Sequence, residues 1–388
     1  MDTIYFDHAA TTPVDPQVLE AMLPHLRDEF GNADSMHHLG QRAKVALEDA
    51  REKVAGLINA EPSEIIFTSG GTESNNAVIR GVMEVSGDKN EIITSPVEHH
   101  AVIHTVECTK RRGGKPVYLD PGSDGVISPG QVDEAINDHT ALVTLMHVNN
   151  EIGSINPVKE IAQVCKDRGV PFHSDTVQSA GKIPVDVKEL GVDFLSISAH
   201  KIYGPKGIGV MYVRNGAPWM PWMMGGSQER RRRGGTTNIP GVVGLATALE
   251  LAISGMDDHR SNFVKLRRHL IERLDDAFED HYQVNGPQEG GVPHIINIGF
   301  RHTEGTKLDG EMLLLNLDIE GICVSNGSAC TSGAVDPSHV LTGIGLDETI
   351  ADASIRISFG KENTMDQIDR FVEALQGVLS RMMVIARE

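Results

Sequence analysis

The chain has 388 residues, of which 40% are hydrophobic and 23% charged; these are ordinary globular values and they exclude extensive disorder. Its 54 acidic and 35 basic residues give a formal net charge of −19, which argues against direct binding to nucleic acid or to an anionic membrane. The four cysteines have no paired spacing, so we expect free thiols rather than a disulfide framework or a zinc site. Neither a secretory signal nor an apolar run of about 20 residues is recognised, and a cytoplasmic protein is expected.

A chain of this length is expected to form two domains, or one large domain with a smaller lobe. Apolar residues at helical spacing predict a helix over 41–58, and the apolar run that follows at 64–68 predicts a strand. Further strands are predicted at 91–94, 115–119, 141–148, 170–174, 193–198 and 208–213. Strands that alternate with helices indicate a mostly parallel sheet with helices on both faces, which binds ligands at the carboxyl ends of its strands.

The pattern changes near residue 240. Two long helices are predicted over 241–256 and 258–280, and the second leads out of the first domain. Strand-like runs at 294–300, 321–325 and 354–359, with helices between and after them, predict a smaller α+β domain. We therefore predict an α/β fold whose large domain spans 16–258 and whose smaller domain combines 1–15 with 259–388.

The segment after the first predicted strand of the large domain is suited to a phosphate group. Gly70 and Gly71 let backbone N–H groups approach a ligand, and Thr72 is a candidate N-cap for the next helix. The N-terminus of that helix favours an anion. A plain turn before a helix is the ordinary alternative for this pattern.

Two later strand ends supply an acid and a lysine. Asp175 ends the strand at 170–174, where it either caps a helix or directs its charge at a ligand. Lys201 follows the strand at 193–198 and is a candidate Schiff-base former, with Lys206 as its rival and an exposed loop lysine as the alternative for both. A phosphate loop, an acid and a lysine at strand ends are together the parts that pyridoxal 5′-phosphate (PLP) requires.

The chain resembles the cysteine desulfurases, which are PLP-dependent enzymes of the class V aminotransferase superfamily. The resemblance rests on motifs that follow one another in the same order along nearly the whole chain. They are YFDHAATTP (5–13), FGNADSMHH (30–38), FTSGGTESNN (67–76), EHHAV (98–102), MHVNNEIG (146–153), HSDTVQSAGK (173–182), SAHKIYGPKG (198–207), RRGGTTNIPG (232–241), NGSACTSG (326–333) and SIRISFG (354–360). The resemblance implies an aminotransferase-like PLP-binding large domain, and the GSACTS form indicates the branch with a long cysteine loop.

The resemblance also implies a role for individual residues of these motifs. It selects Lys201 as the lysine that bonds to the cofactor, pairs Asp175 with the pyridine nitrogen, and pairs Gln178 with the ring hydroxyl. His99 is implied to stack on the ring and to take part in proton transfer, and Asn149 to line the cofactor and substrate pocket. The residues implied to bind the phosphate are Gly71, Thr72, Ser198, His200 and, from the neighbouring subunit of a homodimer, Thr236.

Arg356 is a candidate for binding the substrate carboxylate. In SIRISF the alternation of a strand puts Ile355 and Ile357 on one face and Arg356 on the other. A guanidinium in that position can bind an α-carboxylate through two parallel hydrogen bonds, whereas a surface ion pair is the ordinary alternative. The resemblance favours the carboxylate.

Cys330 lies among small residues, in SNGSACTSG, where little apolar surface would bury it. The resemblance implies that its thiolate attacks the sulfur of cofactor-bound L-cysteine, which yields alanine and a persulfide that passes to an acceptor. It also allows Cys330 to serve briefly as a metal ligand, to a nascent iron–sulfur cluster on a bound scaffold. Of the other cysteines, Cys323 is predicted to be core, Cys165 helical, and Cys108 the second candidate for a reactive thiol.

The resemblance therefore implies an L-cysteine desulfurase that supplies sulfur for iron–sulfur cluster assembly, with an iron–sulfur scaffold or another sulfur acceptor as partner. One alternative is selenocysteine lyase or another PLP-dependent transferase on the same scaffold. A second, from a different class, is a catalytically inactive scaffold in an iron–sulfur assembly complex. The sequence does not identify the acceptor, which could equally be a tRNA-thiolation or DNA-modification system.

Overall fold

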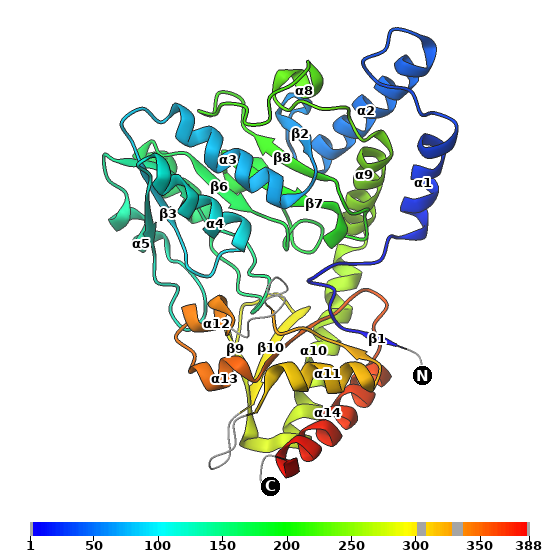
Figure 1. Cartoon of the computed structure of the whole chain (residues 1–388), viewed down its shortest axis with the longest axis vertical. Coiled ribbons are helices and arrows are strands. Elements are labelled where there is room, and N and C mark those ends of the chain that lie inside the picture. The colour runs from blue at the N-terminus through cyan, green and yellow to red at the C-terminus, as the bar shows by residue number, and fades with distance from the viewer. Residues whose placement is uncertain (1–2, 301–307, 328–336, 386–388) are drawn as a thin grey trace.

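The computed structural model describes residues 3–300, 308–327 and 337–385, and Figure 1 shows two parts stacked along its long axis. The upper part contains a seven-stranded sheet in the order β2-β8-β7-β6-β5-β3-β4. Its strands in chain order are β2 (Ile65–Thr68), β3 (Glu91–Thr94), β4 (Lys115–Tyr118), β5 (Thr140–Thr144), β6 (Phe172–Asp175), β7 (Phe194–Ser198) and β8 (Gly209–Val213). From β4 to β7 all neighbours pair in parallel, and β8 runs antiparallel to both β7 and β2. The prediction of a mostly parallel sheet is confirmed.

Helices cover both faces of this sheet. They are α1 (Pro16–Arg27), α2 (His38–Leu57), α3 (Gly71–Val85), α4 (His100–Thr109), α5 (Pro129–Ala135), α6 (Val158–Arg168), α7 (Val187–Leu190), α8 (Gln228–Arg231) and α9 (Ile239–Ser254). Short 3₁₀ turns occur at η1 (Pro62–Glu64), η2 (Lys110–Arg112) and η3 (Ala199–Lys201). Side chains of α3 and α4 pack with Ile66 of β2 on one face, whereas Ile65 and Phe67 pack with α2, α6 and α9 on the other. The strands are therefore apolar on both sides, as expected for a sheet buried between helical layers.

The lower part is built on a three-stranded antiparallel sheet in the order β12-β10-β9. Its elements are α10 (Met256–Phe278), η4 (Glu279–His281), β9 (Tyr282–Asn285), β10 (Ile295–Phe300), α11 (Gly310–Ile319), β11 (Ile322–Cys323), α12 (His339–Gly343), α13 (Glu348–Asp352), β12 (Ser354–Ser358) and α14 (Met365–Ile385). Near the N-terminus, β1 (Ile4–Tyr5) pairs in parallel with β11. Ile4 and Phe6 share a hydrophobic core with α10, α11 and α14 that is separate from the core of the large sheet. These two cores support the proposed domains, 16–258 and 1–15 with 259–388.

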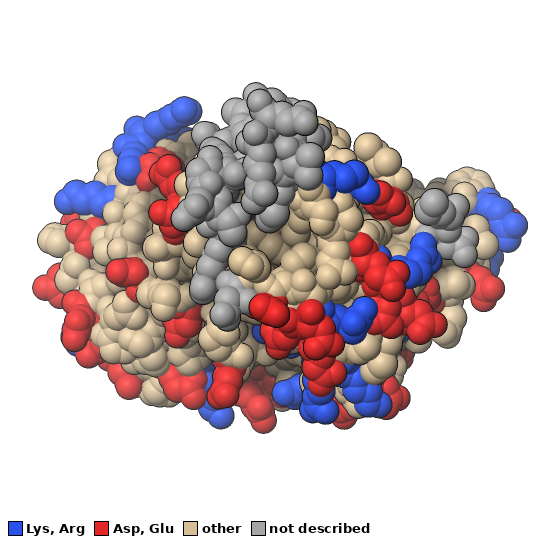
Figure 2. Space-filling model, turned by 90° about the horizontal axis from the view of Figure 1, so that it is seen from below, with Lys and Arg blue, Asp and Glu red and all other residues tan. Residues whose placement is uncertain are grey.

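The surface charge and the helix hydropathy of the described residues match what the acidic composition predicted. Seen from the end of the smaller sheet, acidic side chains are spread over the face, with basic side chains between them (Figure 2). Within the residues that the structure describes, no single helix is both long and apolar enough to cross a membrane. In the part of the chain that the structure describes, α9 and α10 are the one pair that meets the test together, and they are bent by 64° at their junction.

His173 makes the stability of the large sheet sensitive to acid. Its ring lies inside β6 between the hydroxyls of Thr144 and Ser196, and burial lowers its pKa from 6.5 to about 4. The unfolded chain therefore binds a proton below about pH 6.5 that the folded chain excludes, so stability is lost as the pH falls from 6.5 toward 4. Between pH 7 and 5 this single group is expected to reduce the free energy of unfolding by about 2 kcal/mol. Urea unfolding of His173→Gln at both pH values should show a pH-dependent loss smaller by that amount; an unchanged loss would contradict the assignment.

Candidate active site

A cavity of about 340 Å³ lies at the carboxyl ends of β6 and β7, close to the smaller part. Its volume is in the range of about 300–1,000 Å³ that is usual for ligand pockets. The residues expected from the sequence that line it are Gly71, Thr72, His99, Asp175, Gln178, Ser198, His200, Lys201 and Arg356. The fold thus brings together residues that are separated by up to 285 positions (356 − 71) in the chain.

The start of α3 forms the floor of this cavity. Gly70 has a φ of +148°, which L-residues rarely adopt, and it is Gly70 rather than Thr72 that occupies the N-cap position. A Cβ atom on Gly71 would lie 2.6 Å from Cγ2 of Val177, so a side chain there would push into the segment after Asp175. The uncapped N–H groups of the first turn of α3 are therefore open to an anion, with Ser198 close by on β7.

Asp175 holds a turn rather than capping a helix, and its side chain borders the cavity. Its carboxylate accepts a hydrogen bond from the backbone N–H of Val177 at 2.9 Å, which holds the turn after β6. The other oxygen accepts from Nδ2 of Asn75 on α3, at 2.6 Å, while the side chain still borders the cavity. Two donors thus hold an acid that lies nearly buried, with 6% of its surface exposed, at a fixed place in the cavity wall.

Lys201 ends η3, directly after β7, and its amine borders the cavity. Nζ donates to the backbone oxygens of Ala9 and Ala10, at 2.6 Å each, so the N-terminal segment positions the amine. Lys206, its rival in the sequence, is exposed and does not line the cavity. The neighbouring His200 also borders the cavity; burial and the nearby Lys201 lower its pKa to about 4, so the ring is neutral at pH 7.

His99 is a neutral base or hydrogen-bond donor in this setting. Its Nδ1 accepts from the backbone N–H of Ala101 at the start of α4, which places the proton of the neutral ring on Nε2. Burial lowers the pKa of His99, the charge of Lys201 lowers it further, and Asp175 opposes both. The ring is therefore oriented by the helix that it caps and can exchange a proton within the cavity.

Arg356 is buried rather than a surface residue. Ile355 and Ile357 pack into the core of the smaller part, as the alternation predicted, and the guanidinium turns the other way into the cavity wall. Its Nη2 donates to Asp7 at 2.7 Å and to Ser325 at 3.1 Å, and Nη1 donates to the backbone oxygen of Asn150 at 3.0 Å. Nε is buried without a described partner, and the residue borders the cavity.

Two of the expected site residues that the structure describes are not in the cavity wall. Asn149 is buried beneath the cavity wall. Its amide donates to the backbone oxygen of Val97, and its oxygen accepts from the N–H groups of Glu151 and Ile152. It therefore shapes the loop, and the next residue, Asn150, lines the cavity. Thr236 is exposed and outside the cavity. Cys330, with its suggested role as a transient cluster ligand, lies outside the described residues.

Two buried carboxyl groups beside the cavity were not anticipated. Glu98 accepts from the backbone N–H of Met146, and burial raises its pKa well above the usual value. Glu151 accepts from the hydroxyl of Ser338, and burial raises its pKa to about 7. The only signal in the sequence is an apolar neighbour, Val97 before Glu98 and Ile152 after Glu151.

The described cysteines differ in environment. Cys165 is buried on α6, and burial raises its pKa to about 12. The prediction that Cys323 is a core residue is wrong: it is partly exposed beside Asp318, on a strand of two residues that pairs with β1 alone among the described strands. Cys108 lies 3.8 Å from Nη2 of Arg80, outside the cavity.

The chain is similar to known proteins whose chemistry agrees with the geometry of this cavity. Residues 4–371 match the family model described as aminotransferase class V. The chain belongs to the class V aminotransferase family. PLP is the cofactor of this class, and the acid, lysine and anion-binding helix start around the cavity fit its pyridine nitrogen, aldehyde and phosphate.

Relatives narrow the assignment within that family. The chain is 44% identical over 384 residues to the cysteine desulfurase IscS of Dictyoglomus turgidum, covering 99% of this chain and 96% of the relative. It is 43% identical to the cysteine desulfurase IscS of Methanosarcina thermophila, covering 98% and 92%. A solved structure described as a NifS-like protein superposes with a TM-score of 0.90 at 38% identity, covering 98% of this chain and all of the other. The protein is a member of the cysteine desulfurase group.

Proposed function

We propose that the protein is an L-cysteine desulfurase that releases L-alanine and transfers the sulfur as a persulfide on Cys330. The observation that carries the proposal is the single cavity that unites Lys201, Asp175 and Arg356 with the start of α3. A solved structure described as SspA in complex with cysteine, 36% identical with a TM-score of 0.81 and covering 93% of this chain, supports cysteine as the substrate. Bound PLP supplies an electron sink for the bonds at the substrate Cα.

The residues of this chain divide the remaining tasks. Arg356 binds the substrate carboxylate through its guanidinium, which Asp7 and Asn150 hold in place. Lys201 holds the cofactor and moves protons at its Nζ, and His99 exchanges a proton through its Nε2. Asp175, in the cavity wall, would pair with the pyridine nitrogen of the cofactor. The Cys330 thiolate takes the sulfur atom, so that one S–S bond forms as the C–S bond of cysteine breaks and the leaving carbon gains a proton.

The products of a single turnover test this function. With L-cysteine and no added reductant, one equivalent of alanine should form per chain, and the peptide that contains Cys330 should gain the mass of one sulfur atom. Alanine without extra mass on that peptide would favour another PLP-dependent reaction, such as selenocysteine cleavage. No alanine from the cofactor-loaded protein would favour the scaffold alternative.

We further propose a homodimer in which Thr236 reaches the neighbouring active site. Two loops support it: Phe30 and Met36 on one, and Met224 on the other, are 70%, 89% and 71% exposed. A hydrogen bond of 2.6 Å from Gln228 of α8 to Asp34 joins the two segments, and Gln228 also accepts from the backbone N–H of Gly235, the residue before Thr236. Light scattering should give a mass of twice 42.0 kDa, and a mass of 42.0 kDa would refute the proposal.

The sulfur acceptor and the compartment of the reaction complete the proposed function. We propose that an iron–sulfur scaffold protein receives the sulfur in the cytoplasm. The three described cysteines are free thiols, which suits a reducing compartment. Transfer of labelled sulfur to proteins that copurify with the enzyme identifies the acceptor, and a tRNA-thiolating or DNA-modifying acceptor would replace the scaffold.

A further inference from the structure

Lys182 is a largely buried lysine that the proposed reaction does not use. It follows Gly181 in the segment after β6, and its Nζ donates to Oε1 of Gln178 at 3.1 Å. Among the described residues no carboxylate lies within ion-pair distance of this amine. Burial is the main cause that lowers the pKa of Lys182 to about 7, and the charges of Lys201 and Arg356 lower it further.

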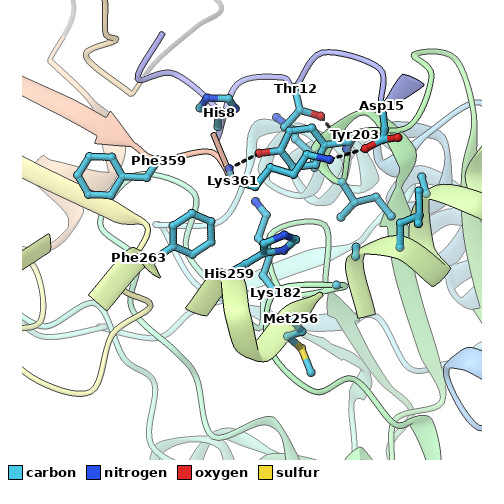
Figure 3. A pocket seen from close by; sticks show the side chains of 16 residues that line it. His8, Thr12, Asp15, Lys182, Tyr203, Met256, His259, Phe263, Phe359 and Lys361 are labelled. Atoms are coloured by element: carbon cyan, nitrogen blue, oxygen red, sulfur yellow. Dashed lines mark hydrogen bonds and ion pairs between the residues drawn. The ribbon is translucent and has the colours of Figure 1, made fainter. Parts of the chain in front are cut away.

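The amine faces a second cavity, of about 50 Å³, which lies behind the active site between the two parts of the molecule (Figure 3). Lys201 borders both this cavity and the active-site cavity. The one acid in the lining, Asp15, is held by Lys361, as the dashed line in Figure 3 shows. The titratable and charged groups that face Lys182 from the surrounding elements are Lys201 and His200 of η3, Arg356 of β12, His8 after β1, His294 before β10, and His259 and Lys361 in the cavity wall.

A continuous set of hydrogen bonds joins Lys182 to the catalytic lysine. Because Lys182 donates to Oε1 of Gln178, the amide is fixed with its NH₂ group on the other side. That NH₂ group donates to the backbone oxygen of Ala9 at 2.8 Å, and the same oxygen accepts from Nζ of Lys201 at 2.6 Å. Gln178 also lines the active-site cavity, so this set of hydrogen bonds reaches the cavity wall.

We propose that Lys182 is a positioning residue that fixes the Gln178 amide and whose charge sets the proton affinity of the Lys201 nitrogen. The inference deepens the proposed function and rests on Lys201 holding the cofactor. Because the charge of Lys201 lowers the pKa of Lys182, a proton on Lys182 by reciprocity opposes protonation of Lys201. Loss of this charge therefore makes the Lys201 nitrogen retain its proton to higher pH.

The visible absorbance of the cofactor-loaded protein without substrate reports this proton directly, because the colour of Lys201-bound PLP depends on it. In a titration from about pH 5.5 to 9.5, Lys182→Met, which nearly preserves the shape, should raise the spectral midpoint by about one pH unit. Lys182→Arg keeps the charge and should leave the midpoint at or below that of the wild type. Met256→Ala enlarges the same cavity without changing any charge, and it should not move the midpoint.

An unchanged midpoint in Lys182→Met would overturn the proposal, as would a rise in both Lys182 variants, since the effect would then follow shape rather than charge. If Lys182→Met does not fold, Lys182→Arg decides alone: a midpoint above the wild-type value overturns the proposal and one at or below it supports it. A wild-type protein without any visible band would instead refute the proposed function.

Discussion

Lys201→Ala is expected to abolish the visible band of the bound cofactor and to lower the rate of alanine formation from cysteine by about 10³-fold or more. Nζ of Lys201 is the one amine of the described chain that lines the active-site cavity. The change removes both the bond to the cofactor and the group that moves protons beside it. Absorbance of protein reconstituted with PLP, and alanine release measured on the same sample, check both effects.

Lys206→Ala is the matched control, since Lys206 lies five residues further on, is exposed, and is outside the cavity. It should retain the band and the rate. Lys201→Ala itself should remain folded, because the oxygens of Ala9 and Ala10 that lose their donor border a cavity that water can enter. Retention of the band in Lys201→Ala, or its loss in Lys206→Ala, would contradict the assignment.

The large sheet and the site could be predicted from the sequence for a common physical reason. The strands of the large sheet are covered on both faces, so each appears in the sequence as a short apolar run. The run 91–94, for example, predicted the bounds of β3 correctly. The carboxyl ends of parallel strands meet at one edge, which brings Asp175 and Lys201 together without knowledge of any contact. The motifs then selected Lys201 over Lys206, a choice that spacing alone left open.

What the sequence did not reveal depends on long-range contacts. Strand β9 was missed because YQVN is half polar and its pairing with β10 is supplied by the fold. The N-cap of α3 is Gly70 rather than Thr72, because the backbone there takes a φ of +148° that favours glycine over the side-chain cap. In the sequence, Lys182 looks like the end of an ordinary polar turn. The packing of η3 and β12 around it, which the sequence does not show, shields its amine from solvent.

Asp175→Asn should lower the rate of alanine formation on the order of 10²–10³-fold while the visible band remains, because Lys201 is untouched. In the proposed function the carboxylate of Asp175 keeps the cofactor's ring nitrogen protonated, and a neutral amide of the same shape cannot. The fold should tolerate the change. The amide oxygen can still accept from Val177, and the buried Oδ1 of Asn75, which has no described partner, can accept from the new NH₂ group when the Asn75 amide turns over.

Asp186→Asn supplies the same chemical change at the N-cap of α7, where the carboxylate accepts from the N–H groups of Lys188 and Glu189 away from the cavity. Asparagine caps helices about as well as aspartate, so the free energy of unfolding should be nearly unchanged. The rate of alanine formation should stay within about twofold of the wild-type rate. Steady-state alanine release, with the visible spectrum recorded before and after addition of cysteine, separates the two variants. Equal rates of alanine formation for Asp175→Asn and Asp186→Asn would contradict the assignment. Asp175 would then serve only the turn that it holds with Val177, and another group would carry the negative charge in the cavity.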